Sequence, residues 1–232
     1  RYQVRQMVTA KTQEPAALVT PLETLSMSYE RIVSDPQVAQ TVILDRDALG
    51  TVMRTVDIRY PRLGRLRPED YPNTLPEGLL EASRDEQQSV CWLMLERATW
   101  HHLRVPTEGE WVIALPDGKR TDALDLSWDR VPPKGFSAES FDASDSPLID
   151  LSQATLAGQQ KTFWCAGDPT VLLNTPSRQA LVAFTETAVF DEQSLEAFSP
   201  ELTKTEIHQN LQTGGYRQVP VLFDRPEAPL LW

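Results

Sequence analysis

Apolar residues recur every three to four positions in the stretch that follows Ser83. With this spacing, Val90, Leu93 and Ala98 fall on one side of a helix. A serine followed three residues later by glutamate is a capping box, in which the two side chains satisfy backbone amides at a helix start. The pattern therefore predicts an amphipathic helix over about residues 84–99.

A second capping pattern lies in the string "LRVPTEGEW". Thr107 and Glu110 have the capping-box spacing, and Pro106 directly precedes the cap. These features predict a short helix over residues 108–115, which the following Pro-Asp-Gly turn ends. The cap would turn Trp111 toward the core.

The rest of the pattern predicts short elements separated by irregular structure. Two more helices are expected, one that begins at Asp35–Pro36 and one over residues 45–56. Short strands are expected at residues 2–7, 161–167 and 180–190. The run "SPELTKTEIHQNL" is compatible with a helix or with a polar loop. Because neither a repeat nor an internal linker is visible, one domain with much irregular structure is expected over residues 1–232.

Composition narrows the classes of partner. The chain has 232 residues, 41% of them hydrophobic, and a formal net charge of −11. This charge argues against nucleic acid as a partner, and no apolar run reaches the ~18 residues typical of a membrane-spanning helix. A protein or peptide partner, or other domains of a longer chain, is expected instead. Because the chain begins at Arg1 without an apolar signal segment, we expect a cytoplasmic fragment of a longer protein.

The string "LRVPTEGEW" resembles the signature "yRLPTEAEWE" of the formylglycine-generating enzyme family, also called sulfatase-modifying factors. Upstream, the order Cys91-Trp92-Leu93 resembles the Cys-x-Trp-Leu segment of that family, and Trp128 stands near the position of its Pro-Trp-Gly element. The residues of the expected structural signature are Trp92, Arg104, Pro106, Thr107, Glu108, Glu110, Trp111 and Trp128.

The resemblance implies a C-type-lectin-like α+β single domain with low regular secondary structure. In such a domain Trp92, Trp111 and Trp128 would be buried anchors of the core. Members of the family with formylglycine-generating activity hold copper with a cysteine pair close together near the C-terminal end. Cys91 and Cys165 do not form that motif, and they are expected to be inert buried thiols.

Other metal chemistry also lacks its motif. Iron-binding relatives group their histidines in one motif, whereas His101, His102 and His208 are adjacent or far apart. The acidic run "DASDSPLID" lacks the spacing of an EF-hand loop. It is compatible with a weak calcium site, although a solvated acidic loop is the favoured interpretation. The acidic residues of that run are Asp142, Asp145 and Asp150.

The sequence thus predicts a pseudoenzyme of the formylglycine-generating-enzyme-like fold, with no catalytic, cofactor-binding or metal-binding residues. Its expected function is protein or peptide binding within a larger signalling or defence protein. Two alternatives stay open. One is a metal-dependent oxidoreductase of the same family, and the other is a structural scaffold domain.

Overall fold

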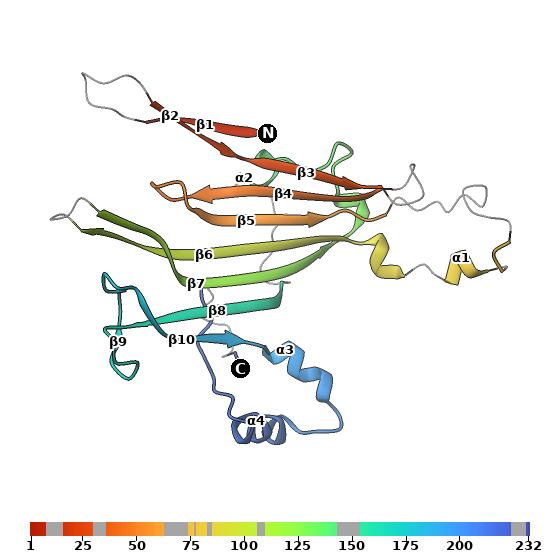
Figure 1. Ribbon diagram of the computed structural model, residues 1–232. Coiled ribbons are helices and arrows are strands. Elements are labelled where there is room, and N and C mark those ends of the chain that lie inside the picture. Colours follow the sequence, from red (N-terminus) through yellow and green to blue (C-terminus); the bar gives the residue numbers. More distant parts are fainter. Residues whose placement is uncertain are drawn as a thin grey trace. The chain divides into compact units, whose positions relative to one another are not determined.

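Antiparallel β-strands make up most of the chain (Figure 1). The computed structural model describes residues 1–7, 16–29, 36–62, 74–76, 78–82, 85–105, 110–142, 154–223 and 231–232. The α+β lectin-like fold expected from the sequence is wrong, because the four segments expected to be helices contain strands. The chain divides into two compact units, Arg1–Leu95 with Ala123–Gln153, and Glu96–Asp122 with Ala154–Trp232. The single domain expected over residues 1–232 stays a prediction, since two strands belong to both units.

The first unit contains a hairpin and part of a larger sheet. Strands β1 (Tyr2–Met7) and β2 (Ala16–Pro21) pair with Tyr2 opposite Pro21. The larger sheet runs in the order β3-β4-β5-β6-β7 and is represented here by β3 (Glu23–Ser28), β4 (Gln37–Arg46), β5 (Val52–Arg59), the first residues of β6 (Cys91–Val105) and the last of β7 (Glu110–Leu126). Its short helices are α1 (Leu79–Ala82), η2 (Glu86–Ser89), η3 (Trp128–Arg130) and α2 (Glu139–Asp142).

The second unit pairs the rest of β6 and β7 with later strands in the order β6-β7-β8-β10. Its other strands are β8 (Thr155–Cys165), β9 (Leu172–Leu173) and β10 (Leu181–Ala188). The helices that follow are α3 (Glu192–Leu195), η5 (Glu196–Phe198) and α4 (Lys204–Thr213). A cluster of Leu195, Ile207 and Trp232 packs these helices against the last described residues. No helix among the described residues is long and apolar enough to cross a membrane.

The segment expected to be the clearest helix is strand β6. Cys91, Leu93 and Leu95 are buried, and the residues between them are only partly buried. This period of two is the pattern of a strand. Leu93 was expected on the buried face of a helix, and it lies on the buried face of strand β6. The helix predicted over residues 84–99 is therefore wrong, although a short 3-10 helix capped by Asp85 precedes β6.

The second expected helix is also a strand, because β7 begins at Glu110 and continues to Leu126. The cap itself falls on residues 106–109, which lie outside the described residues. Trp111 is 54% exposed and Trp128 is 51% exposed. The burial expected for these two tryptophans is wrong, and Trp92 is only partly buried.

Of the remaining expectations, the two helices are wrong and the three strands are confirmed. The helices expected after Asp35 and over residues 45–56 are wrong, because β4 begins directly after Pro36 and β5 occupies Val52–Arg59. The strands expected near residues 2–7, 161–167 and 180–190 are confirmed as β1, β8 and β10. The run left open between helix and loop contains α4, with Thr203 and Glu206 as its capping box.

Candidate functional site

Two arginines and an aspartate form a buried group in the second unit. Asp122 is fully buried, at 0% exposure. Its carboxylate accepts hydrogen bonds from Arg120 Nε and Nη2, at 2.8 and 2.6 Å to Oδ1, and from Arg97 Nη2, at 2.7 Å to Oδ2. Arg120 Nη1 also reaches Gln159 Oε1 at 3.4 Å. We call these four residues, Arg97, Arg120, Asp122 and Gln159, the arginine cluster.

The strands explain why these side chains meet. Arg97 lies on β6, Arg120 and Asp122 lie on β7, and Gln159 lies on β8. Because β6, β7 and β8 are neighbours, side chains from all three can share one face. Arg120 and Asp122 are two positions apart, so they point to the same side of β7.

The arginine cluster holds a segment that is distant in sequence. Arg97 Nη1 donates to the carbonyl oxygen of Phe223 at 3.1 Å, and its guanidinium lies 5.4 Å from the Phe223 ring centroid. Gln159 Nε2 donates to the Pro220 carbonyl at 2.9 Å, and the Leu222 amide donates back to Gln159 Oε1 at 2.8 Å. The cluster therefore fastens residues 220–223 to the sheet.

A second polar group joins the same three strands. Asp117 on β7 accepts from Lys161 Nζ at 2.5 Å and from Thr99 Oγ1 at 3.0 Å. His101 Nε2 lies 3.3 Å from Asp117 Oδ1. Burial opposes the charged form of Asp117, but the hydrogen bonds from Lys161 and Thr99 outweigh it and lower the pKa of this carboxyl.

This second group has the geometry of a bridge between strands. The Thr99 hydroxyl donates to Asp117 and accepts from the Gly118 amide at 3.1 Å. The Thr99 hydroxyl is therefore held in place by hydrogen bonds to both neighbours. Lys161 and Asp117 form an ion pair, which makes a structural bridge the simplest account of the group.

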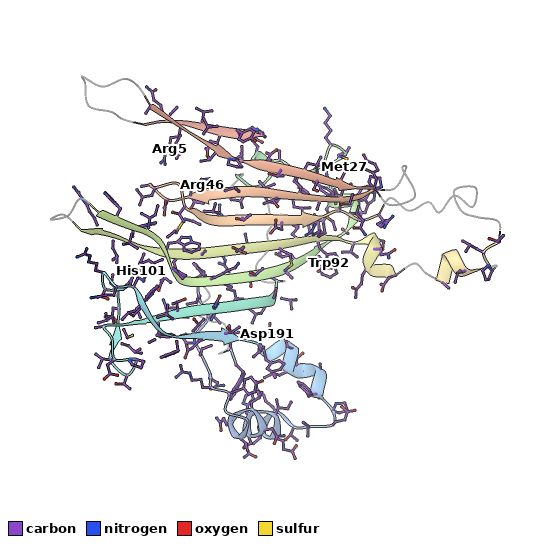
Figure 2. All side chains as sticks on the ribbon, in the orientation of Figure 1. Arg5, Met27, Arg46, Trp92, His101 and Asp191 are labelled. Carbon is purple, nitrogen blue, oxygen red and sulfur yellow. The ribbon has the colours of Figure 1, made fainter. Side chains whose placement is uncertain are left out.

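The first unit carries a groove of about 420 Å³ beside strand β3. Leu25 and Met27 of β3 are 55% and 48% exposed at one side of it, and Trp128 also lines it. Figure 2 shows Met27 on β3, the strand that ends this part of the sheet. The groove thus adjoins a sheet edge and exposes apolar side chains.

The groove is lined by a hydrogen-bonded group that we call the bracket, which consists of Tyr60, Gln40 and the backbone of Phe136. Tyr60 Oη donates to Gln40 Oε1 at 2.5 Å and accepts from the Phe136 amide at 2.8 Å. Gln40 Nε2 donates to the Phe136 carbonyl at 2.8 Å. Burial raises the pKa of the Tyr60 hydroxyl. Gly135, with φ of +77°, lets the chain turn against Tyr60.

The expected signature residues do not form one site. Arg104 and Trp111 meet in the second unit, with the guanidinium 5.5 Å from the ring centroid. Trp92 and Trp128 belong to the first unit, and Trp92 Nε1 donates to the Gln87 carbonyl at 3.4 Å. Glu110 is the first residue of β7. Pro106, Thr107 and Glu108 lie outside the described residues.

The candidate metal ligands are also separate. Cys91 and Cys165 are free and buried, and burial raises the pKa of the Cys91 thiol to about 11. His102 Nδ1 accepts from the Ala114 amide at 3.2 Å, and His208 lies against Trp232. No group of three metal-binding side chains occurs among the residues that the structure describes. The acidic run falls mostly outside them, with only the backbone of Asp142 described.

Sequence reasoning missed the arginine cluster. Gly118, Arg120, Asp122, Leu124 and Leu126 are all buried on one face of β7. Every second residue of this segment is therefore buried, as in a strand. The pattern is hard to recognise in the sequence because two of the buried positions hold charged residues, Arg120 and Asp122. The contact with Phe223 has no local signal at all.

The known proteins that the chain is similar to belong to a different family from the one that its signature string suggested. The family model for the insecticide toxin TcdB middle/C-terminal region matches residues 1–115. No curated protein is similar enough to the chain to match it. The resemblance to formylglycine-generating enzymes is therefore wrong. The described residues of the string that carried it belong to strands β6 and β7.

Solved structures match the whole chain. The crystal structure of TcdB2-TccC3 is 35% identical with a TM-score of 0.86, and that of TcdB2-TccC3-Cdc42 is 36% identical with a TM-score of 0.86. A Photorhabdus luminescens Tc holotoxin pore with a mutation in TccC3 is 35% identical with a TM-score of 0.87. Each match covers 100% of this chain and 11% of the other.

These matches also overturn the binding-module function expected from the sequence. The solved chains are parts of toxin complexes, and this chain spans about a tenth of their length. These similar chains occur in complexes with other proteins, and each contains further segments beyond the matched one. Over its whole length, the chain is similar to one segment of the TcdB2-TccC3 toxin chains.

Proposed function

We propose that this chain is a structural segment of a TcdB-like component of a multi-chain insecticidal toxin. The observation that carries the proposal is the match of the entire chain to TcdB2-TccC3, at 35% identity and a TM-score of 0.86. The match of residues 1–115 to the TcdB middle/C-terminal region supports it independently. Of the functions weighed from the sequence, the structural scaffold lies nearest to this proposal.

The polar groups of the second unit support a structural role. The arginine cluster and the Asp117 bridge both join β6, β7 and β8. Buried charges are costly unless paired, and paired charges fix which groups lie opposite one another. We infer that these groups fix the register of long strands and hold residues 220–223 on the sheet.

A segment exchange tests the proposal. Residues 1–232 would replace the matching segment of TcdB2, and the chimera would be produced together with TccC3. A structural segment of the same kind should let the chimera purify with TccC3 as a complex of the same size as unmodified TcdB2 gives. The matched control is the same chimera with Asp122→Ala, which should lower the yield of complex.

The opposite result is equally clear. A soluble, folded chimera that fails to purify with TccC3, under conditions where unmodified TcdB2 does so, would contradict the proposal. Circular dichroism of the chimera establishes that it is folded, so that misfolding is not mistaken for loss of assembly.

A further inference from the structure

Among the residues that the structure describes, strand β3 is bonded on one side only for most of its length. It pairs with β4, from Glu23 opposite Val42 to Ser28 opposite Gln37. It ends the order of strands in this part of the sheet. Leu25 and Met27 are exposed on it and line the groove. An edge that exposes apolar side chains can pair with a further strand.

One residue already occupies the beginning of this edge. Arg1 N donates to the Glu23 carbonyl at 3.0 Å, and the Glu23 amide donates to the Arg1 carbonyl at 3.3 Å. Two residues that exchange both bonds form the hydrogen-bonded pair of an antiparallel ladder. The Arg1 guanidinium also bonds to the Glu23 carboxylate at 3.1 Å, and to Glu139. Arg1 is therefore paired with β3 by its backbone and held there by its side chain.

The pairing shifts by one residue at this point. Tyr2 lies opposite Pro21, whereas Arg1 lies opposite Glu23, so Leu22 is an extra residue. This is the arrangement of a β-bulge, which bends a strand and carries it on in a new register. Strand β1 thus pairs with β2 on one side of the bulge and has started to pair with β3 on the other.

We propose that the residues that precede Arg1 in the longer chain extend β1 and add an antiparallel strand to the free edge of β3. The inference rests on the proposed function, which places this chain within a longer one. A strand from elsewhere would have to enter an edge whose first position Arg1 already fills, whereas an extension of β1 continues the existing ladder.

The register follows from the Arg1–Glu23 pair. The first residue before Arg1 lies opposite Thr24, the second opposite Leu25, the third opposite Ser26 and the fourth opposite Met27. Opposed residues of an antiparallel pair have their side chains on the same face. The second and fourth residues should therefore be apolar and cover the groove beside Leu25, Met27 and Trp128.

Paired cysteines in the full-length chain test this register. The first preceding residue and Thr24 form a non-hydrogen-bonded pair, whose Cα separation of about 4.5 Å suits a disulfide. With cysteine at both positions, mild oxidation should cross-link most molecules. The matched control keeps Thr24→Cys but moves the other cysteine to the second preceding residue, whose side chain is on the opposite face. That control should stay reduced. Equal cross-linking in both variants, or in neither, would overturn the proposal.

Hydrogen exchange gives a second measurement. It uses the unmodified full-length chain, so it does not depend on whether a substituted variant folds. The Leu25 and Met27 amides point to the outer edge, and those of Thr24 and Ser26 point to β4. Exchange should be slow at all four. Fast exchange at Leu25 and Met27 alone would show an open edge and overturn the proposal.

Two further outcomes separate the possibilities. Slow exchange without the disulfide would assign the edge to a different strand, and that too would overturn the inference. The TcdB2 chimera would still assemble with TccC3 if only the pairing of β3 were wrong. Failure of this inference is therefore distinguishable from failure of the proposed function.

Discussion

At the scale of single residues, Asp122 joins both arginines of the arginine cluster. Replacing it with alanine leaves the guanidiniums of Arg97 and Arg120 buried without their carboxylate. Breaking a buried ion pair in this way costs about 3–5 kcal/mol. We expect Asp122→Ala to lower the free energy of unfolding by that amount, measured by urea denaturation with tryptophan fluorescence.

The control for this prediction lies on the same two strands. Glu96 and Lys119 form an ion pair at 2.7 Å, but both side chains are accessible to solvent. An exposed pair contributes about 1 kcal/mol or less, so Glu96→Ala should have a small effect. Similar losses for Asp122→Ala and Glu96→Ala would show that the arginine cluster does not stabilise the protein as described.

Gly135 is a second position where adding a single atom, the Cβ of alanine, should destabilise the protein. A Cβ at Gly135 would lie 2.9 Å from Tyr60 Oη, at a φ of +77°. The strained backbone and the displaced bracket together should make Gly135→Ala cost about 1–3 kcal/mol in thermal or urea unfolding. Gly158 in β8 has no atom within 4 Å of the corresponding position. Gly158→Ala should therefore be neutral or stabilising by about 0.5–1 kcal/mol, and equal losses would contradict this account.

At the scale of elements, α4 begins with a capping box that was not identified from the sequence. Thr203 Oγ1 accepts from the Glu206 amide at 3.3 Å, and the Thr203 amide donates to Glu206 Oε2 at 2.9 Å. These bonds satisfy backbone amides that lack partners in the first turn. Thr203→Ala should cost about 1 kcal/mol.

The same substitution two residues later is the control. Thr205 lies inside α4 and is exposed, and alanine is the better helix former there. Thr205→Ala should be neutral or slightly stabilising. Adding Glu206→Ala to Thr203→Ala should cost less than the sum of the single losses, because the two side chains share one motif. Strictly additive losses would argue against the capping box.

Local patterns predicted some elements and misassigned others. Strands β1, β8 and β10 were predictable from short runs of alternating or β-branched residues. Strand β6 was not, because Leu93 fits an apolar stripe of either period, and pairing with neighbouring strands decides between them.

The candidate site was harder to predict than the elements. Arg120 and Asp122 read as surface residues until their partner on β6 is known. The contact between Arg97 and Phe223 joins residues far apart in the sequence. Trp111 was expected inside because a helix start would have turned it inward, whereas in β7 it lies on an exposed face. Contacts between distant strands determine these positions, and short sequence windows do not contain them.

At the scale of the whole molecule, exposed sheet edges should govern the behaviour of the isolated chain. Leu25 and Met27 present apolar side chains on β3, which invites edge-to-edge association. We expect the 232-residue chain to self-associate as concentration rises, and Met27→Lys to reduce that association in analytical ultracentrifugation. Val171 is also exposed but lies outside the strands. If Val171→Lys reduced association as much as Met27→Lys, general surface hydrophobicity and not the β3 edge would be the cause.

We propose that this chain acts as a structural β-sheet segment of a TcdB-like toxin component. The most direct test is a cryo-electron microscopy map of the TcdB2 chimera that carries residues 1–232, in complex with TccC3. The account predicts continuous density for β3 to β10 at the position of the replaced segment, with the arginine cluster resolved between β6, β7 and β8. A complex that forms with this segment unfolded, or with its strands in another order, would contradict it.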